Sequence, residues 1–231
     1  MIGLIGAMPV EMDALLAQLQ ARKDKAVGMD TFHSGLLFGQ PAVLGVCGPG
    51  KVNAAICAQS MIRDFAPDWV LNLGVAGAAD DRLNIGDLVI ASSAVQHDMD
   101  TSPLGDPVGF VSKMNRVQFP CDAVLSEKLL EATSVLSDAK AYHGVVATGD
   151  QFIGSGETRL RIRDRFDALA VEMEGGAVAH VCTFFGTPFG ILRSILDRAN
   201  GDATMDYPTF TRLAAAHSVA VVEALLRGMK A

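Results

Sequence analysis

Three carboxylates stand at or just beyond the ends of apolar runs that are typical of buried strands: Glu11, Glu174 and Asp197. In open α/β sheets, ligands bind at the ends of the strands, so we expect these acids to converge on one pocket. Such a set suits cleavage of a glycosidic bond through an oxocarbenium-like state. One acid would protonate the leaving group, one would activate water, and one would hold a sugar hydroxyl.

A fourth acid, Glu172, stands two residues before Glu174 in the segment A-V-E-M-E-G-G-A-V-A. In an extended segment, residues i and i+2 point to the same side, so both acids should face one way where a strand ends and a helix begins. The alternative is that Glu174 only favours the start of a helix, where the dipole stabilises an anion.

The general acid of this scheme, Asp197, must hold a proton near neutral pH. The apolar run Phe189 to Leu196 precedes it and would provide the burial that favours the neutral carboxyl. The alternative is an ion pair with Arg193 or Arg198, which would give Asp197 a purely structural role.

Two further motifs suggest other chemistry, and the residues argue against both. Gly45 to Lys51 has the G-x-x-x-x-G-K spacing of a phosphate loop, but Val52 stands where the magnesium-binding Ser or Thr belongs. An NTPase is therefore disfavoured, although the loop could still contact a ligand. His97 to Asp100 carries potential metal ligands, but a turn with solvated acids explains them better, so no metal is expected.

The bulk composition limits the class of protein. The 231 residues are 50% hydrophobic and 19% charged, which predicts one ordered domain over residues 1–231. The net charge of -7, without a long Lys/Arg cluster, argues against nucleic-acid or anionic-membrane partners. The N-terminus lacks the basic segment of a signal peptide, and no apolar run is long enough to span a bilayer. The four widely spaced cysteines are expected to be free thiols, which indicates a cytoplasmic setting.

Strands alternate with helices along the chain, which predicts a three-layer α/β/α domain around a central twisted sheet. Expected strands are 1–8, 31–37, 42–47, 69–74, 87–91, 94–99, 143–148, 169–171 and 187–196. Expected helices begin at Pro9 and then span 52–65, 123–136, 157–166, 175–181 and 208–229, the last with Leu213, Ala216, Ala220, Ala224 and Leu225 on its inner face. Strands within 31–47 and within 87–99 are too close for crossover helices, so we expect antiparallel pairs and a mixed sheet. Residues 100–120 form a long loop, which in a compact domain is usually functional or contacts a partner.

These pieces, in this order, resemble the bacterial 5'-methylthioadenosine/S-adenosylhomocysteine nucleosidases of the nucleoside phosphorylase-I superfamily. The matching segments are G-L-I-G-A-M-P-V-E at 3–11, G-P-G-K-V-N-A-A at 48–55, N-L-G-V-A-G at 72–77, T-G-D-Q-F-I at 148–153, A-V-E-M-E at 170–174 and L-R-S-I-L-D at 192–197. V-E-M-E with the downstream Asp is specific to the superfamily, and the N-terminal G-A-M-x-x-E points to the nucleosidase branch. The resemblance implies the nucleoside phosphorylase/hydrolase fold, and no cofactor is expected.

The resemblance also implies roles for the acids. Asp197 would protonate adenine N7 with help from Arg193 through a network. Glu11 would bind and activate the water. Glu174 would hold a ribose hydroxyl, with Met173 packed on the sugar.

The rest of the substrate site is implied in the same way. Phe152 would stack on adenine and the Ile153 backbone would read its edge. Met8, Pro49 and Tyr207 would line the 5'-alkylthio end, and Glu172 and the loop residues Val75, Ala76 and Gly77 are counted with the substrate-binding residues. Members of the family form homodimers in which the long loop reaches into the neighbouring site, so Leu104 and Pro107 are the candidates for that contact.

The same comparison favours water over phosphate as the nucleophile. Phosphorylases of this superfamily carry a phosphate-binding Arg two residues before the glycine that ends the strand. Here Asn72 precedes Gly74 at that spacing, and a buried phosphate dianion needs such a cation. Two departures weaken the match: Val75 and Leu196 stand where many members have Ser, and the second removes a hydrogen bond near Asp197.

The sequence thus predicts hydrolysis of the N-glycosidic bond of 5'-methylthioadenosine and S-adenosylhomocysteine, releasing adenine and a 5-thioribose product, in methionine salvage. One alternative is a hydrolase of another 5'-modified adenosine, such as aminodeoxyfutalosine, because the difference lies in the 5' pocket. A phosphate requirement would indicate a phosphorylase. The remaining alternative is a non-catalytic nucleoside-binding protein, against which the retention of all three acids argues.

Overall fold

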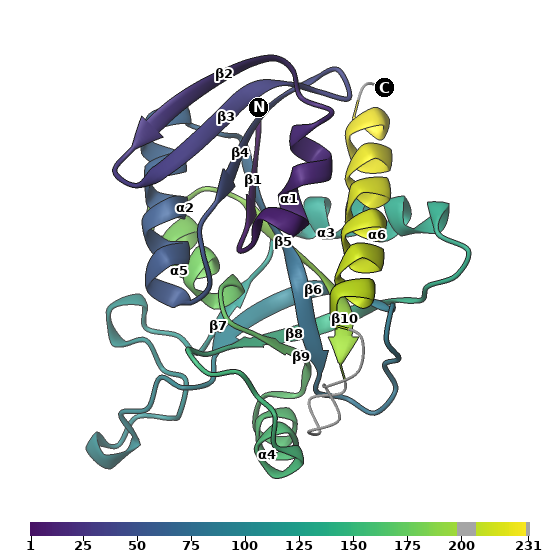
Figure 1. Cartoon of the computed structure of the whole chain (residues 1–231). Coiled ribbons are helices and arrows are strands. Elements are labelled where there is room, and N and C mark those ends of the chain that lie inside the picture. The colour runs from purple at the N-terminus through teal and green to yellow at the C-terminus, as the bar shows by residue number, and fades with distance from the viewer. Residues whose placement is uncertain (198–206, 230–231) are drawn as a thin grey trace.

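A computed structural model of the protein describes the backbone of residues 1–197 and 207–229, and the side chains of 1–197 and 213–229 (Figure 1). The strands are β1 Ile2–Gly6, β2 Gln20–Val27, β3 Asp30–Leu37, β4 Gln40–Val46, β5 Trp69–Ala78, β6 Leu88–Gln96, β7 Gln118–Pro120, β8 Ala141–Thr148, β9 Ala168–Glu172 and β10 Phe189–Asp197. The helices are α1 Pro9–Leu16, α2 Lys51–Phe65, α3 Ala123–Ala132, α4 Gly156–Phe166, α5 Gly175–Phe185 and α6 Tyr207–Gly228. Short 3-10 turns are η1 Ser102–Leu104, η2 Ser112–Met114 and η3 Thr133–Val135.

All ten strands belong to one mixed sheet. Strands β5, β10, β6, β8 and β9 pair in a closed ring, and β1, β4, β3 and β2 continue outward from β5. The pairs of β1 with β4 and β5 are parallel, whereas β3 is antiparallel to both β2 and β4. The predicted mixed α/β sheet is therefore confirmed, and the ring adds a closed half that the sequence pattern does not show.

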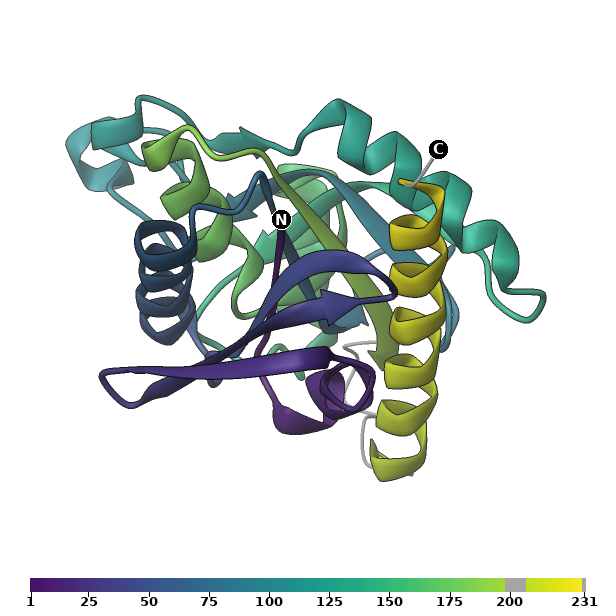
Figure 2. The same ribbon diagram turned by 90° about the horizontal axis from the view of Figure 1, so that it is seen from above.

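Helices cover both faces of the sheet. Two perpendicular views show α1, α3 and α6 on one side and α2 and α5 on the other (Figures 1 and 2). Helix α4 packs against β9, at the end of the molecule far from the β2–β3 hairpin (Figure 1). None of the described helices combines the length and the apolar character that a bilayer-spanning segment needs.

Neighbouring residues of the central strands point to opposite helix layers. In β1, Leu4 belongs to the cluster under α1, α3 and α6, while Ile5 belongs to the cluster under α2 and α5. In β5, Leu71 and Val70 divide in the same way, and all four side chains are fully buried. Strands buried on both faces read as continuous apolar runs, which is why the sequence reveals them so clearly.

The strand predictions fail at three places, one of which is the short strand β7 at the end of the segment 100–120 that was predicted to be a loop. Residues 87–99 were expected to form an antiparallel pair, but Leu88–Gln96 is the single strand β6, which pairs with β8 in parallel and with β10 antiparallel. The polar residues Ser92 and Ser93 look like a turn in the sequence, yet they mark only a shift in the register with β8. Strand β2 was not predicted, because its Q-A-R-K-D-K-A-V residues lie at a solvated edge and show no apolar alternation.

The inner face of α6 was predicted about one residue out of phase. Leu213 is 39% exposed and Ala216 is exposed, whereas Ala214, Val221 and Leu225 are buried. Of the predicted inner residues, Leu225 is therefore buried as expected. The sequence of α6 is rich in alanine and valine around much of its circumference, so the spacing of its apolar residues alone does not identify which stripe faces the core.

Candidate active site

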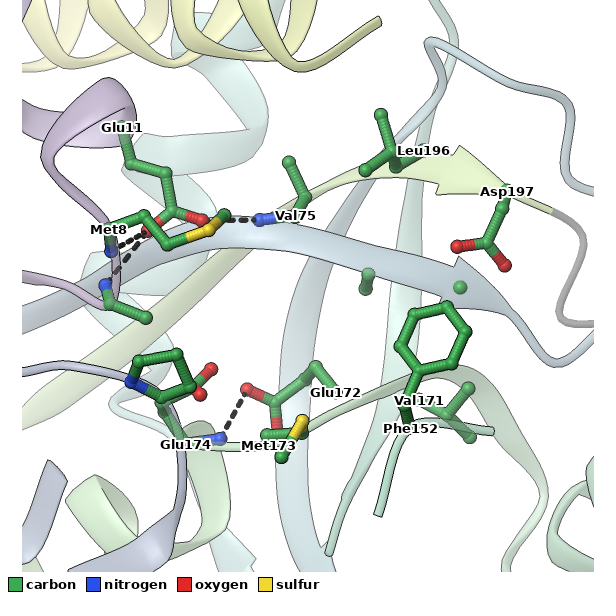
Figure 3. Close-up of a pocket in the computed structure, with 14 residues that line it drawn as sticks. Met8, Glu11, Val75, Phe152, Val171, Glu172, Met173, Glu174, Leu196 and Asp197 are labelled. Carbon is green, nitrogen blue, oxygen red and sulfur yellow. Dashed lines mark hydrogen bonds between the residues drawn. The ribbon is translucent and has the colours of Figure 1, made fainter. Parts of the chain in front are cut away.

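A pocket lies where β1, β5, β9 and β10 end, and it gathers the three predicted acids (Figure 3). Its lining residues are Ala7, Met8, Glu11, Pro49, Val75, Ala76, Gly77, Phe152, Val171, Glu172, Met173, Glu174, Leu196 and Asp197. Most of the residues singled out from the sequence are therefore brought together. Ala7 and Val171 are additional lining residues, and as small or apolar positions they carry no chemical signal in the sequence.

Glu11 lies in the first turn of α1, directly after β1, and its carboxylate is buried. One carboxylate oxygen, Oε2, accepts the amides of Ala7 at 2.8 Å and Met8 at 2.9 Å. The other oxygen, Oε1, accepts the amide of Val75 at 3.2 Å (Figure 3). Three backbone donors, two directly after β1 and one within β5, thus hold this carboxylate in place at the pocket wall.

Arg193 lies beneath the pocket and is completely buried. Its Nη2 donates to the Asn72 side-chain oxygen and to Glu172 Oε2, and lies 3.7 Å from Glu174 Oε2. Asn72 in turn donates from Nδ2 to the Ile5 carbonyl at 3.0 Å. The sequence assigned Arg193 to the substrate contacts, but the structure places its guanidinium under the carboxylates and outside the lining of the pocket.

Glu172 accepts more hydrogen bonds than either Glu11 or Glu174. Besides Arg193, it accepts the Thr148 hydroxyl and the amides of Glu174 at 3.1 Å and Gly175 at 2.7 Å. These donors come from β8, β10 and the start of α5. A carboxylate that is hydrogen-bonded on so many sides is suited to holding the floor of the pocket together.

Gly74 explains how the large Arg193 side chain fits under the sheet. A Cβ atom at this position would lie 2.1 Å from Arg193 Nη1 and 3.0 Å from Glu11 Oε1. The N-L-G segment of β5 therefore serves the site twice, since Asn72 binds the guanidinium and Gly74 leaves room for it.

Glu174 is the N-terminal capping position of α5, and its side chain reaches across to the start of α2. Its Oε1 accepts the Gly50 amide at 2.9 Å. Burial and the nearby Glu172 carboxylate raise the pKa of Glu174 to about 7, although Arg193 and the Gly50 amide oppose this shift. The group can therefore change its charge near neutral pH, unlike an ordinary surface glutamate.

Asp197 ends β10 and lies at the opposite end of the pocket from Glu11 (Figure 3). It is 8% exposed, and it borders a smaller recess together with Phe152 and Ile153. Phe152 is 66% exposed, so it is not a core residue and offers an open aromatic face. The gap between these groups could hold a flat polar ring between an aromatic side chain and a carboxyl group.

The remaining predicted residues are not among the described residues that line the pocket. Leu104 belongs to η1 in the long loop, is 84% exposed, and does not line the pocket of its own chain. Tyr207 begins α6, but its side chain lies outside the described residues, as does Arg198. The proposed ion-pair alternative between Asp197 and Arg198 therefore also falls outside them.

The phosphate-loop spacing has a structural explanation. Lys51 Nζ donates to Asp98 Oδ1 at 2.7 Å, while the Gly50 and Lys51 amides at the helix start donate to Glu174 and Asp150. The positions that a phosphate would need are thus already bound by carboxylates, which argues further against an NTPase. Asp98 of the H-D-M-D segment is committed to this ion pair, and the described residues contain no group of three side chains suited to a metal ion.

The fold agrees with comparisons to known proteins. Residues 1–227 match the family model of the Phosphorylase superfamily, and the chain therefore belongs to that superfamily.

Within the superfamily, the chain is similar to 5'-methylthioadenosine/S-adenosylhomocysteine nucleosidases. It is 39% identical over 227 residues to the nucleosidase of Staphylococcus aureus (strain MRSA252), covering 98% of this chain and 99% of that protein. The crystal structure of the Neisseria meningitidis nucleosidase in complex with methylthio-immucillin-A matches with a TM-score of 0.93 at 34% identity, covering 98% of each chain. The futalosine hydrolase of Helicobacter pylori strain 26695 matches with a TM-score of 0.92 at 33% identity, covering 98% of this chain and 97% of that one. The predicted family resemblance is confirmed.

Proposed function

We propose that this chain, acting as one domain, hydrolyses the N-glycosidic bond of 5'-methylthioadenosine and S-adenosylhomocysteine and releases adenine and the 5-thioribose product. The observation that carries the proposal is the arrangement of the pocket: buried Glu11 at one end, Asp197 beside an open Phe152 ring at the other, and Glu174 on the wall opposite Glu11. A nucleoside has the matching order of sugar and base.

Adenine would lie at the Asp197 end. Phe152 stacks on the ring, the Ile153 backbone contacts its edge, and the Asp197 carboxyl gives a proton to N7. The C1'–N9 bond then breaks with its electron pair passing to the base, which the new proton neutralises. Burial of Asp197 favours the protonated acid that this step requires.

The sugar would lie over Met173, with Glu174 accepting a hydrogen bond from a ribose hydroxyl. Glu11 holds a water molecule, whose oxygen bonds to C1' while its proton passes to the carboxylate. The three backbone amides that hold Glu11 fix the direction from which this water attacks.

The nucleophile is water rather than phosphate. Asn72 is completely buried and uses its amide on the Ile5 carbonyl and its oxygen on Arg193, so it offers nothing to a dianion in the pocket. Arg193 itself is neutralised by Glu172. A phosphate here would lie beside Glu11 and Glu174, and the described residues that line the pocket include no free cation.

The 5' group would lie against the apolar pocket residues Met8, Pro49 and Val75. Tyr207 is proposed as a further contact on the family resemblance alone. A second candidate function is hydrolysis of a futalosine-type nucleoside, favoured by the solved futalosine hydrolase at a TM-score of 0.92. The two functions share the base and ribose contacts and differ in the size and polarity of the 5' substituent.

The protein would act as a cytoplasmic homodimer in methionine salvage. The second copy would cover the exposed apolar side chains Val52 and Ile56 of α2 and Phe184 of α5, and the two helices border a common hollow. Leu104, which is also exposed, and Pro107 would then reach the pocket of the partner. All four cysteines are free thiols, which agrees with a reducing compartment.

The deciding experiment is chromatography of adenine released from methylthioadenosine, with and without phosphate. Equal release in both conditions supports hydrolysis, and dependence on phosphate would indicate a phosphorylase instead. Comparison of kcat/KM for methylthioadenosine, S-adenosylhomocysteine and aminodeoxyfutalosine then distinguishes the two candidate substrates. Tight binding without any product would overturn the proposal in favour of a binding protein.

A further inference from the structure

The groups that cap the start of α2 come from residues far away in the sequence. Its N-terminal capping residue is Gly50, which has no side chain to offer, and no acidic residue lies in the first turn. Instead, Glu174 Oε1 accepts the Gly50 amide at 2.9 Å and Asp150 Oδ1 accepts the Lys51 amide at 2.7 Å. Two carboxylates from other loops therefore satisfy donors at a helix start, where anions are also favoured by the dipole.

Asp150 is itself held in place by Asp98. Asp98 Oδ2 accepts the Asp150 amide at 2.9 Å, and Asp98 Oδ1 accepts Lys51 Nζ at 2.7 Å. Although burial acts in the opposite direction, the hydrogen bond from Lys51 lowers the pKa of Asp98, so the ion pair persists at neutral pH. Asp98, Asp150 and Lys51 thus close a ring of hydrogen bonds, which we call the loop clamp.

The loop clamp joins three segments, and two of them also line the pocket. Asp98 follows β6, Asp150 follows β8, and Lys51 begins α2. Phe152 lies two residues after Asp150, and Pro49 lies two residues before Lys51. The three clamp residues do not line the pocket, yet their hydrogen bonds connect the segments that lead into these two pocket-lining loops.

The backbone of Gly50 shows how tightly the helix start is held. Its φ of 98° and ψ of 158° belong to a region that is almost restricted to glycine. A Cβ atom there would also lie 3.2 Å from Asp150 Oδ1. This conformation presents the Gly50 amide to Glu174 while the next amide meets Asp150.

We propose that Asp150, held by Asp98 and Lys51, is a positioning residue for the glycosidic cleavage: it docks the start of α2 onto the pocket and so keeps the Gly50 amide on Glu174. The inference rests on the proposed role of Glu174 as the ribose ligand. The Gly50 amide favours the ionised carboxylate, which is the form that accepts a hydrogen bond from a sugar hydroxyl.

The direction in which the pKa of Glu174 moves when Asp150 is replaced distinguishes this positioning role from a direct charge effect of Asp150. The charged and titratable groups facing Glu174 are Glu172, Arg193, Glu11 and Cys47, from β9, β10, α1 and the end of β4. Removing the negative charge of Asp150 would by itself lower the pKa of Glu174. Releasing the Gly50 amide would raise it, because a donor to the carboxylate is lost.

The experiment measures the pKa of Glu174 by NMR titration of protein labelled with ¹³C in its glutamate carboxyl groups, the signal being assigned from Glu174→Gln. In Asp150→Ala we expect the pKa of Glu174 to rise by about half a unit or more, the acid limb of kcat/KM on methylthioadenosine to move by the same amount, and kcat/KM at pH 7 to fall by about twofold or more. Asp150→Asn keeps an acceptor oxygen and should restore most of the wild-type behaviour.

Asp80→Ala is the matched control. Asp80 also accepts a backbone amide and a cationic side chain, both from Arg82, but lies outside the pocket lining. It should leave the pKa of Glu174 and the pH profile unchanged. If Asp150→Ala does not fold, the same titration is made on Asp98→Asn, in which the pKa of Glu174 is also expected to rise.

An unchanged or lowered pKa of Glu174 in a folded clamp variant would overturn the positioning role. Absence of adenine release by the wild-type protein would contradict the proposed function instead, and the titration would still decide whether the clamp holds the Gly50 amide on Glu174.

Discussion

The guanidinium of Arg193 and the carboxylate of Glu172 form an ion pair that is almost completely removed from solvent, with side-chain exposures of 1% and 2%. Glu174 lies 3.7 Å from the same guanidinium nitrogen and therefore shares a cation that is already neutralised. Two carboxylates share one cation, and Glu172 is the better paired of the two because it has the shorter contact and several further donors. The negative charge that is poorly compensated is therefore that of Glu174.

Replacement of Glu174 by glutamine tests this imbalance through stability. The pKa of Glu174 is about 7 in the folded protein and near 4.5 when unfolded, so the folded state binds more protons between these values and loses stability as the pH rises through them. Glu174→Gln should therefore unfold at a higher temperature than wild type at pH 8, by the equivalent of up to about 3 kcal/mol, and by much less at pH 4.5. A difference that does not vary with pH in thermal melts would contradict the raised pKa.

The same variant should lose activity while it gains stability. A neutral amide is a weaker acceptor for a ribose hydroxyl than a carboxylate, so kcat/KM on methylthioadenosine should fall by about 10- to 100-fold. In the wild-type protein, kcat/KM should decline below about pH 7 as Glu174 takes up a proton. A near-normal rate for a folded Glu174→Gln protein would remove the ribose role.

Replacement of Arg193 should strongly destabilise the folded protein. Arg193→Met leaves the Glu172 carboxylate buried without its cation, which we expect to cost about 3–5 kcal/mol of unfolding free energy in urea titrations. The double variant with Glu172→Gln should recover part of that loss. Arg227→Met is the matched control, because Arg227 pairs with Glu223 on the surface of α6 and should change stability by less than about 0.5 kcal/mol. Equal effects of the two Arg variants would argue against a buried pair.

A single methyl group at Gly74 should disturb the site. Gly74→Ala places a Cβ atom 2.1 Å from the Arg193 guanidinium, so that either the guanidinium or strand β5 must move. We expect a loss of about 1–3 kcal/mol in thermal or urea unfolding together with reduced turnover. Gly156→Ala, at the first residue of α4 with no atom within 4 Å of its added Cβ, should be neutral or slightly stabilising. Normal stability and activity of Gly74→Ala would show that the guanidinium does not need this space.

Asp197 should matter only where the leaving group needs a proton. Asp197→Asn should lower the turnover of adenine nucleosides by about 10²- to 10⁴-fold, because an amide cannot deliver a proton to N7. A nitrophenyl riboside, whose leaving group departs without protonation, should be cleaved at a much less reduced rate by the same variant. Equal losses on both substrates would assign Asp197 a structural role instead.

The sequence predicted the elements whose signals are local. Buried strands appear as apolar runs because both faces pack against helices, and Glu11 and Asp197 are recognisable because each lies at or near the end of such a run. The edge strand β2 escaped prediction because solvated residues occupy both of its faces, and β6 was divided in two because Ser92 and Ser93 interrupt its apolar pattern.

The partners of the charged groups were decided only by the tertiary structure. Arg193 was expected to help Asp197 through a network, and the sequence does not show that it binds Glu172 and Asn72, the latter 121 residues away. Asp150 caps a helix that begins 99 residues earlier, and nothing around either residue signals this contact. Residue type and local periodicity determine which groups lie at the strand ends. The order in which strands join the sheet determines which of these groups meet, and that order depends on packing between distant segments.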